Sequence, residues 1–315
     1  MTRWLTLVLT TLLWGGMMIC VYREHRGSSG GMDAQSDRMA LEALFDERAA
    51  PREVWRVYFD PRLMRPPSER NKPYGPEHGP ESVRQAALAE AVRAGAREGE
   101  VLVGKREVRQ TIRGFTRAEV TSHMRLQWPE GFGEAPFQFT GDLVEEGTMR
   151  FSRERGLEEV VAKARVFASL ELRTRGYREG HTLKLSLVFF NGPDRKIMDQ
   201  ELAVPLIGSC APTFGLSPFF FNPHINAGDR WSVATLNLAP QERGRLRTLM
   251  VQVLQERKTI QYMGLPTPVY EAVAKGESLT STAYYSPDGH VLVQYVQFAG
   301  LRLTMIREEL RETQP

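Results

Sequence analysis

A run of uncharged, mostly apolar residues occupies positions 4–22, with Arg3 before it and Arg23 and Arg26 after it. At about 1.5 Å of rise per residue, a helix of this length nearly matches a hydrocarbon core of about 30 Å. The run therefore predicts a single N-terminal transmembrane helix. We expect the chain to contact a membrane through residues 4–22.

Two other readings of this run stay open, a cleaved signal peptide and a lipoprotein signal. The segment ends without an A-x-A pattern and exceeds the usual apolar region of a signal peptide, about 7 to 15 residues, so an uncleaved anchor is favoured. A lipoprotein signal would place Gly or Ala before the modified cysteine, whereas Cys20 follows Ile19. Cleavage after the run would make the protein secreted.

The orientation of the anchor follows from its short N-terminal flank. The charges on the two sides nearly cancel, but a short segment before a first apolar helix usually stays in the cytoplasm. We therefore expect an inner-membrane anchor with the remaining chain in the periplasm. Residues 27–31, which are only glycine and serine, are typical of a flexible tether.

Charge and cysteine content exclude several function classes. The net charge of +3 is spread over 41 basic and 38 acidic residues, and no basic run alternates with aromatic residues, so nucleic acid is not an expected partner. The two cysteines are Cys20, in the apolar run, and Cys210, far along the chain, so no internal disulfide is expected. No C-x-x-C pair is present to bind zinc.

The chain divides into three parts by composition. Residues 1–26 form the anchor or signal segment. Residues 27–100 are predicted to hold the tether, two short helices and a proline-rich connector. The first helix is expected at 37–49, the connector at 61–80, and the second helix from about Ser82. Residues 101–315 are predicted to form an antiparallel β domain.

Alternation with a period of two defines this last part. Apolar and polar residues alternate from 160 to 172, which predicts one long half-buried strand. Later strands are expected at 230–237, 246–263, 268–275, 279–286, 290–298 and 301–307. Pro287, Asp288 and Gly289 predict a tight hairpin turn. Short turns between successive strands indicate a meander, so the fold class is mainly β with N-terminal helices (α+β), a curved antiparallel sheet or half-barrel behind the transmembrane helix.

Residues 216–307 carry a resemblance to a known family. Their order of motifs resembles uncharacterised extracytoplasmic proteins related in fold to the LolA/LolB lipoprotein carriers. That resemblance implies a curved antiparallel sheet around an apolar cavity, and a lipid, acyl chain or lipoprotein as ligand. The motifs are Asp229-Arg230-Trp231, Val253 with Glu256, residues 264–270, Tyr284-Tyr285-Ser286-Pro287-Asp288-Gly289 with Val291 and Val293, and Leu301-Arg302-Leu303.

Motifs for catalysis are missing from the sequence. There is no H-E-x-x-H, G-x-S-x-G, P-loop or dinucleotide-binding pattern, and the six histidines have no ligand spacing. Ser209 and Cys210 lie among small residues, but no histidine can be assigned to them as a base. Glu145 and Glu146 are adjacent and point to opposite faces of a strand, so we interpret them as turn and rim charges. We expect no enzyme activity, cofactor or metal.

One aromatic segment stands out as a candidate ligand-binding element. Phe214, Phe219, Phe220 and Phe221 lie in a stretch interrupted by glycine and proline. Consecutive phenylalanines cannot all face one side of a strand, so at least one must cover a neighbouring surface. The segment either plugs the protein's own core, or forms the wall or lid of an apolar pocket, or touches the bilayer.

The sequence is compatible with two functions. The first is an apolar-ligand or lipoprotein-binding module, for which a wide, lined cavity would be evidence. The alternative is a structural or protein-interaction component of a cell-envelope complex, for which a filled core and an exposed edge strand would be evidence.

Overall fold

The computed structural model describes residues 41–46, 49, 52–65, 68–70, 72, 79–114, 116–133, 143–166, 170–192, 195–205, 219–236, 246–276, 280–298 and 301–308. The predicted membrane segment at 4–22, Phe214, Ser209 and Cys210 lie outside these residues. Among the residues that are described, none of the helices combines the length and the hydropathy that crossing a bilayer requires.

The described residues form one antiparallel sheet of fourteen strands. The strands are β1 Arg52–Phe59, β2 Val101–Arg113, β3 Arg117–Leu126, β4 Leu143–Ser152, β5 Gly156–Val166, β6 Leu170–Glu179, β7 Thr182–Asn191, β8 Lys196–Pro205, β9 Arg230–Leu236, β10 Leu246–Tyr262, β11 Leu265–Lys275, β12 Thr280–Tyr285, β13 Val291–Phe298 and β14 Leu301–Arg307. The prediction of a mainly β protein with a large, curved antiparallel sheet is confirmed.

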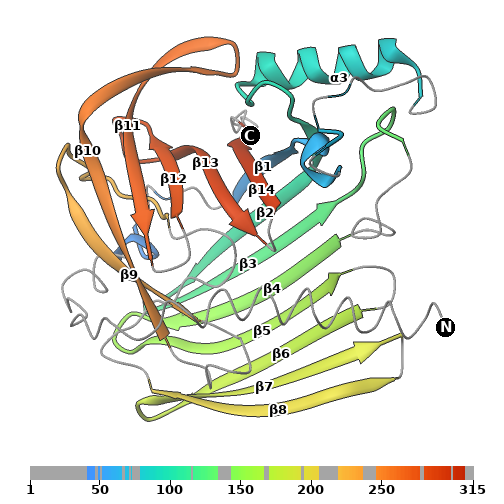
Figure 1. Cartoon of the computed structure of the whole chain (residues 1–315). Helices are drawn as coiled ribbons and strands as arrows, with labels where there is room; N and C mark the ends of the chain where they lie inside the picture. The colour runs from blue at the N-terminus through green and yellow to red at the C-terminus, as the bar shows by residue number, and fades with distance from the viewer. Residues whose placement is uncertain are drawn as a thin grey trace.

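The chain enters this sheet at its middle. β1 lies between β2 and β14, the strands from β1 to β8 run outward to one edge, and β9 starts at the other edge and leads back to β14. Figure 1 shows β2–β8 as a broad twisted sheet from which β9–β13 curl away. Because β1 pairs with both β2 and β14, a strand that precedes residue 100 belongs to the sheet.

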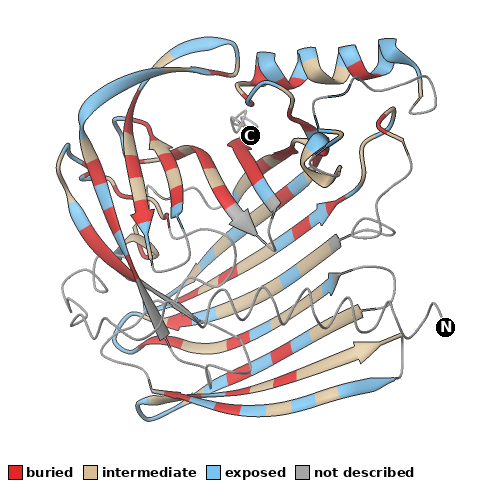
Figure 2. Ribbon diagram, in the orientation of Figure 1, coloured by how far each residue is buried: buried red, intermediate tan, exposed pale blue. Residues whose placement is uncertain are grey.

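The two faces of the sheet differ. On β1, Trp55, Val57 and Phe59 belong to the large apolar core, and we call the side they occupy the inner face. A second cluster covers the same face at β3–β8, where Leu41 and Phe45 pack on it. Figure 2 shows buried residues concentrated on β1 and β11–β14, whereas much of β4–β8 is half-buried.

The single strand predicted at residues 160–172 is wrong, because the chain reverses within it. β5 ends at Val166 and β6 begins at Leu170, and these two residues pair with each other. Ala164 and Leu172 also lie directly opposite each other across the reversal, so their side chains share a face, and their separation is an even number of residues. The alternation therefore continues in phase through the reversal and hides it.

The helix predicted near Ser82 is α3, Glu81–Ala94, but its N-cap is Pro80 and no side chain caps it. It ends at Gly95, which has a φ of 100° and lies against the β10–β11 hairpin. A Cβ at this position would lie 2.4 Å from the carbonyl oxygen of Gln261, so glycine permits both the turn and the contact. Figure 1 shows α3 lying across the top of the sheet.

The remaining predicted helical elements are only partly described. Of the helix predicted at 37–49, residues 41–43 are helical within the described part. In the predicted connector at 61–80, a short 3-10 helix, η1 Pro61–Met64, begins after Asp60, whose carboxylate accepts a hydrogen bond from the backbone N–H of Arg62.

Candidate binding site on the inner face

The described part of the predicted aromatic segment packs inside the sheet. Phe219 is 8% exposed, and its ring lies 6.3 Å from that of Tyr285 on β12. The Phe220 ring lies 5.8 Å from that of Trp231 on β9, and the Tyr285 hydroxyl donates a 3.1 Å hydrogen bond to the Phe220 carbonyl oxygen. Phe220 also packs against both inner clusters, so it joins them.

The third phenylalanine of this segment turns toward the β12–β13 hairpin. The ring centroid of Phe221 lies 4.6 Å from that of His290, and the next backbone N–H, that of Asn222, donates to the Gly289 carbonyl at 3.0 Å. Burial, assisted by the positive charge of Arg307, holds the pKa of His290 below its ordinary value of 6.5. The predicted hairpin turn thus holds one end of the aromatic segment with a neutral imidazole at neutral pH.

A cation lies buried on the inner face between the two apolar clusters. Arg106 on β2 is 7% exposed. Its Nε donates a 3.1 Å hydrogen bond to Ser122 Oγ, which is the one polar contact of its side chain within the described part of the chain. A buried guanidinium normally has an anionic partner, because removing an unpaired charge from water is costly.

A buried carboxylate oxygen lies on the same face two strands away. Arg106 is in register with Met124 on β3, and Met124 is in register with Glu145 on β4. The Oε2 atom of Glu145 is buried and accepts no hydrogen bond from the described residues. Glu146 pairs with His123 on the other side, so the predicted opposite orientation of the two glutamates is confirmed. Their placement in a turn is wrong, because both are inside β4.

The register continues from Glu145 along an apolar line. Four half-buried residues, one from each of the strands β5–β8, lie side by side on the inner face. The line ends at β8, the edge of the sheet. It consists of Ala164, Leu172, Phe189 and Met198. We call Arg106, Met124, Glu145 and these four residues the inner row.

A second buried arginine, on the other side of Arg106, is neutralised within the protein. Arg307 on β14 is in register with Trp55, which is in register with Arg106. Arg307 Nη1 lies 3.6 Å from Glu53 Oε1, and the other oxygen of this carboxylate accepts a 3.2 Å hydrogen bond from Trp55 Nε1. Glu53 therefore compensates Arg307, whereas the described residues supply no anion to Arg106.

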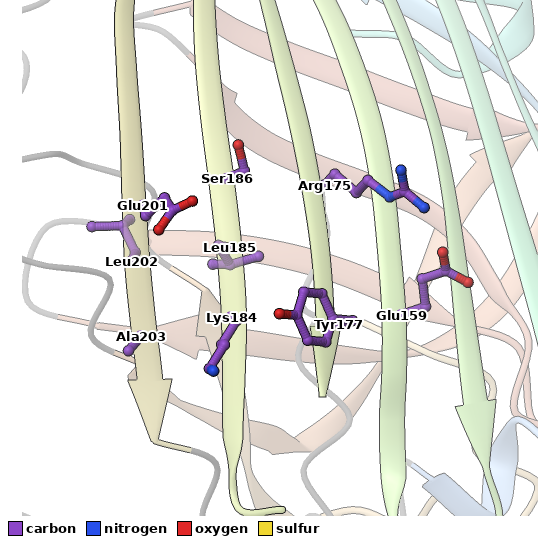
Figure 3. A pocket seen from close by; sticks show the side chains of 9 residues that line it. All are labelled: Glu159, Arg175, Tyr177, Lys184, Leu185, Ser186, Glu201, Leu202 and Ala203. Carbon is purple, nitrogen blue, oxygen red and sulfur yellow. The ribbon is translucent and has the colours of Figure 1, made fainter. Parts of the chain in front are cut away.

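The outer face carries an open depression over four strands of the sheet. A depression of about 560 Å³ lies over β5–β8, and Figure 3 shows its lining side chains spread across the four strands instead of meeting at one point. Its charges are mixed, since Arg175 and Lys184 lie near Glu159 and Glu201. This surface has the character of a solvated sheet face.

Sequence reasoning singled out the aromatic segment but missed the inner row. The available signal was a charge at an inward position. Arg106 and Glu145 each occupy the phase of the alternation that their neighbours, Val108 on β2 and Met149 on β4, fill with apolar side chains. Among the described residues, no group of three or more His, Cys, Asp or Glu side chains is placed to hold a metal ion.

No protein-family model matches the sequence, and no curated protein matches it. Among solved structures, the chain is similar to a beta-barrel-like protein of domain of unknown function DUF1849 from Brucella abortus, with a TM-score of 0.39 and 8% sequence identity. The alignment covers 82% of this chain and 94% of that chain.

Proposed function

We propose that this protein is a membrane-anchored, periplasmic binding protein that holds a lipid or acyl chain against the inner face of its curved sheet. The observation that carries the proposal is the inner row, in which the buried Arg106 and the partly buried carboxylate of Glu145 are followed by half-buried apolar residues on neighbouring strands. An amphipathic ligand has the same division into a polar and an apolar part. The resemblance of residues 216–307 to uncharacterised extracytoplasmic proteins related in fold to the LolA/LolB carriers supports the same class of ligand.

The aromatic segment has a supporting part in this proposal. Phe220 contacts both inner clusters, and Phe219 and Phe221 are held by Tyr285 and His290. These three rings would form the apolar wall beside the ligand. In the described structure these rings contact the protein's own side chains. A segment that only filled the core would make the same contacts.

The test is native mass spectrometry, with lipid extraction, of the full-length protein purified from membranes in mild detergent. We expect co-purifying lipid, and its loss in a Leu172→Glu variant, because a charge on the apolar line would oppose an acyl chain. The matched control is Val161→Glu, on the neighbouring strand but on the outer face and 45% exposed, which should keep the lipid. Lipid-free wild-type protein that also takes up no added lipid would contradict the proposal.

A structural or partner-binding role in an envelope complex is the second candidate. In the described part of the chain, β8 has one neighbouring strand, β7, and its Ile197 is 48% exposed. An exposed edge strand can pair with a strand of another protein. Pull-down of a defined envelope partner by wild-type protein but not by an Ile197→Pro variant would favour this role.

A further inference from the structure

We infer that the ligand of the inner face is a zwitterionic aminophospholipid, whose phosphate binds Arg106 and whose ammonium group binds Glu145. This inference rests on the proposed function and adds to it the chemistry of the headgroup. It starts from a buried arginine and a half-buried glutamate with one buried oxygen, neither of which has a charged partner among the described residues.

The chemistry of the two groups defines what each would accept. A guanidinium presents several N–H donors in a planar fork that matches the oxygens of a phosphate, and Arg106 uses one of them on Ser122. A carboxylate can only accept, and Oε2 of Glu145 has no donor. A purely anionic headgroup would satisfy Arg106 but repel Glu145, whereas a quaternary ammonium would offer Glu145 no N–H.

The spacing also fits a small headgroup that carries both charges. Arg106 and Glu145 are separated by two strand spacings, about 10 Å between their Cα atoms, and both side chains project from the same face. No ion pair or hydrogen bond joins them in the described structure. A phosphoethanolamine group between them would satisfy both charges at once.

The apolar line gives the direction of the acyl chain. From Glu145 on β4 to Met198 on β8 the inner row crosses four strand spacings, about 19 Å. An extended long acyl chain can lie along such a line across the strands. The headgroup then lies at the middle of the sheet and the tail ends at the β8 edge.

The experiment uses full-length protein, delipidated in non-ionic detergent, and measures binding of three lysophospholipids with the same acyl chain by native mass spectrometry. The headgroups are phosphoethanolamine, phosphocholine and phosphoglycerol. We expect the wild type to bind the phosphoethanolamine lipid about tenfold more tightly than the other two, because only this headgroup pairs both Arg106 and Glu145. Arg106→Met and Glu145→Gln should each abolish that preference.

Controls on the outer face use the same substitutions. Arg175→Met and Glu146→Gln remove exposed charges from β6 and β4, and both should keep the wild-type preference. If the wild type binds no lysophospholipid, the proposed function itself fails. If it binds all three equally, or if Arg106→Met keeps the preference, only the headgroup assignment is overturned.

Stability without ligand separates this role from a structural ion pair. If Arg106 has no partner in the lipid-free protein, the Arg106→Met variant should unfold at the same urea concentration as the wild type or a higher one. Suppose instead that this variant is destabilised and that adding Glu145→Met restores stability. The two residues would then be partners of each other, and the inference would be wrong.

Discussion

Gly289 lets the β12–β13 turn approach the aromatic segment, and replacing it by alanine should loosen that segment. Its φ is 90°, and a Cβ added there would lie 1.9 Å from the carbonyl oxygen of Asn222, far inside van der Waals contact. Gly192 offers a matched control, because its φ is 89° and a Cβ there would meet nothing within 4 Å. The two alanine variants thus share the backbone strain and differ in the clash.

The expected magnitudes follow from this difference. Left-handed backbone costs a residue with a Cβ about 1–2 kcal/mol, and both variants bear this cost. At Gly289 the Asn222 backbone must also move. That movement weakens two hydrogen bonds, from Asn222 N–H to Gly289 and from the Tyr285 hydroxyl to Phe220, each contributing about 1 kcal/mol. Gly289→Ala should therefore lower the free energy of unfolding by about 3–4 kcal/mol, roughly twice the effect of Gly192→Ala.

The assay is urea unfolding of the full-length protein in detergent, followed by tryptophan fluorescence, because Trp231 contacts Phe220. In addition, hydrogen exchange should show faster exchange at residues 219–222 in Gly289→Ala alone. Equal destabilisation by the two substitutions, with unchanged exchange of that segment, would refute the idea that contact with the turn holds the segment in place.

Two further perturbations test the same region. Tyr285→Phe should cost about 1 kcal/mol, because it leaves the carbonyl of the aromatic segment without its donor, whereas Tyr177→Phe, at a 55% exposed side chain, should be neutral in urea unfolding. Burial lowers the pKa of His290 in the folded state, so its contribution to stability is present above pH 6.5 and is lost as the pH falls through the lowered pKa. Urea midpoints measured from pH 7.5 down to pH 5 should therefore fall less steeply for His290→Gln than for the wild type. His123→Gln, at an exposed position, is the control. Identical slopes of midpoint against pH for all three proteins would contradict this prediction.

The local pattern of residues was enough to predict most strands. Alternation with a period of two, together with turn residues such as Pro287, Asp288 and Gly289, depends on neighbours in the chain, and the strands β9–β14 follow the predicted ranges closely. The wrong prediction of a single strand at residues 160–172 also comes from using only the local pattern. A reversal that preserves the phase of the alternation leaves no trace in a pattern of period two.

The candidate site shows the limit of this reasoning. The phenylalanines were found because their composition is unusual, but their partners, Tyr285, Trp231 and His290, could not be assigned from the sequence. From the sequence, Glu145 is interpreted as a turn or rim charge, and Arg106 is not singled out. Only the pairing of β2, β3 and β4 places them on the same face.

The sequence by itself determined that this chain forms an antiparallel meander, because alternation and turns are local properties. Tertiary structure alone decided that β1 lies between β2 and β14, pairing Trp55 with Arg307 near the other end of the chain. It also decided that two opposite charges share the inner row. Both results depend on strand register, which is set by packing between distant segments and not by the residues of any one strand.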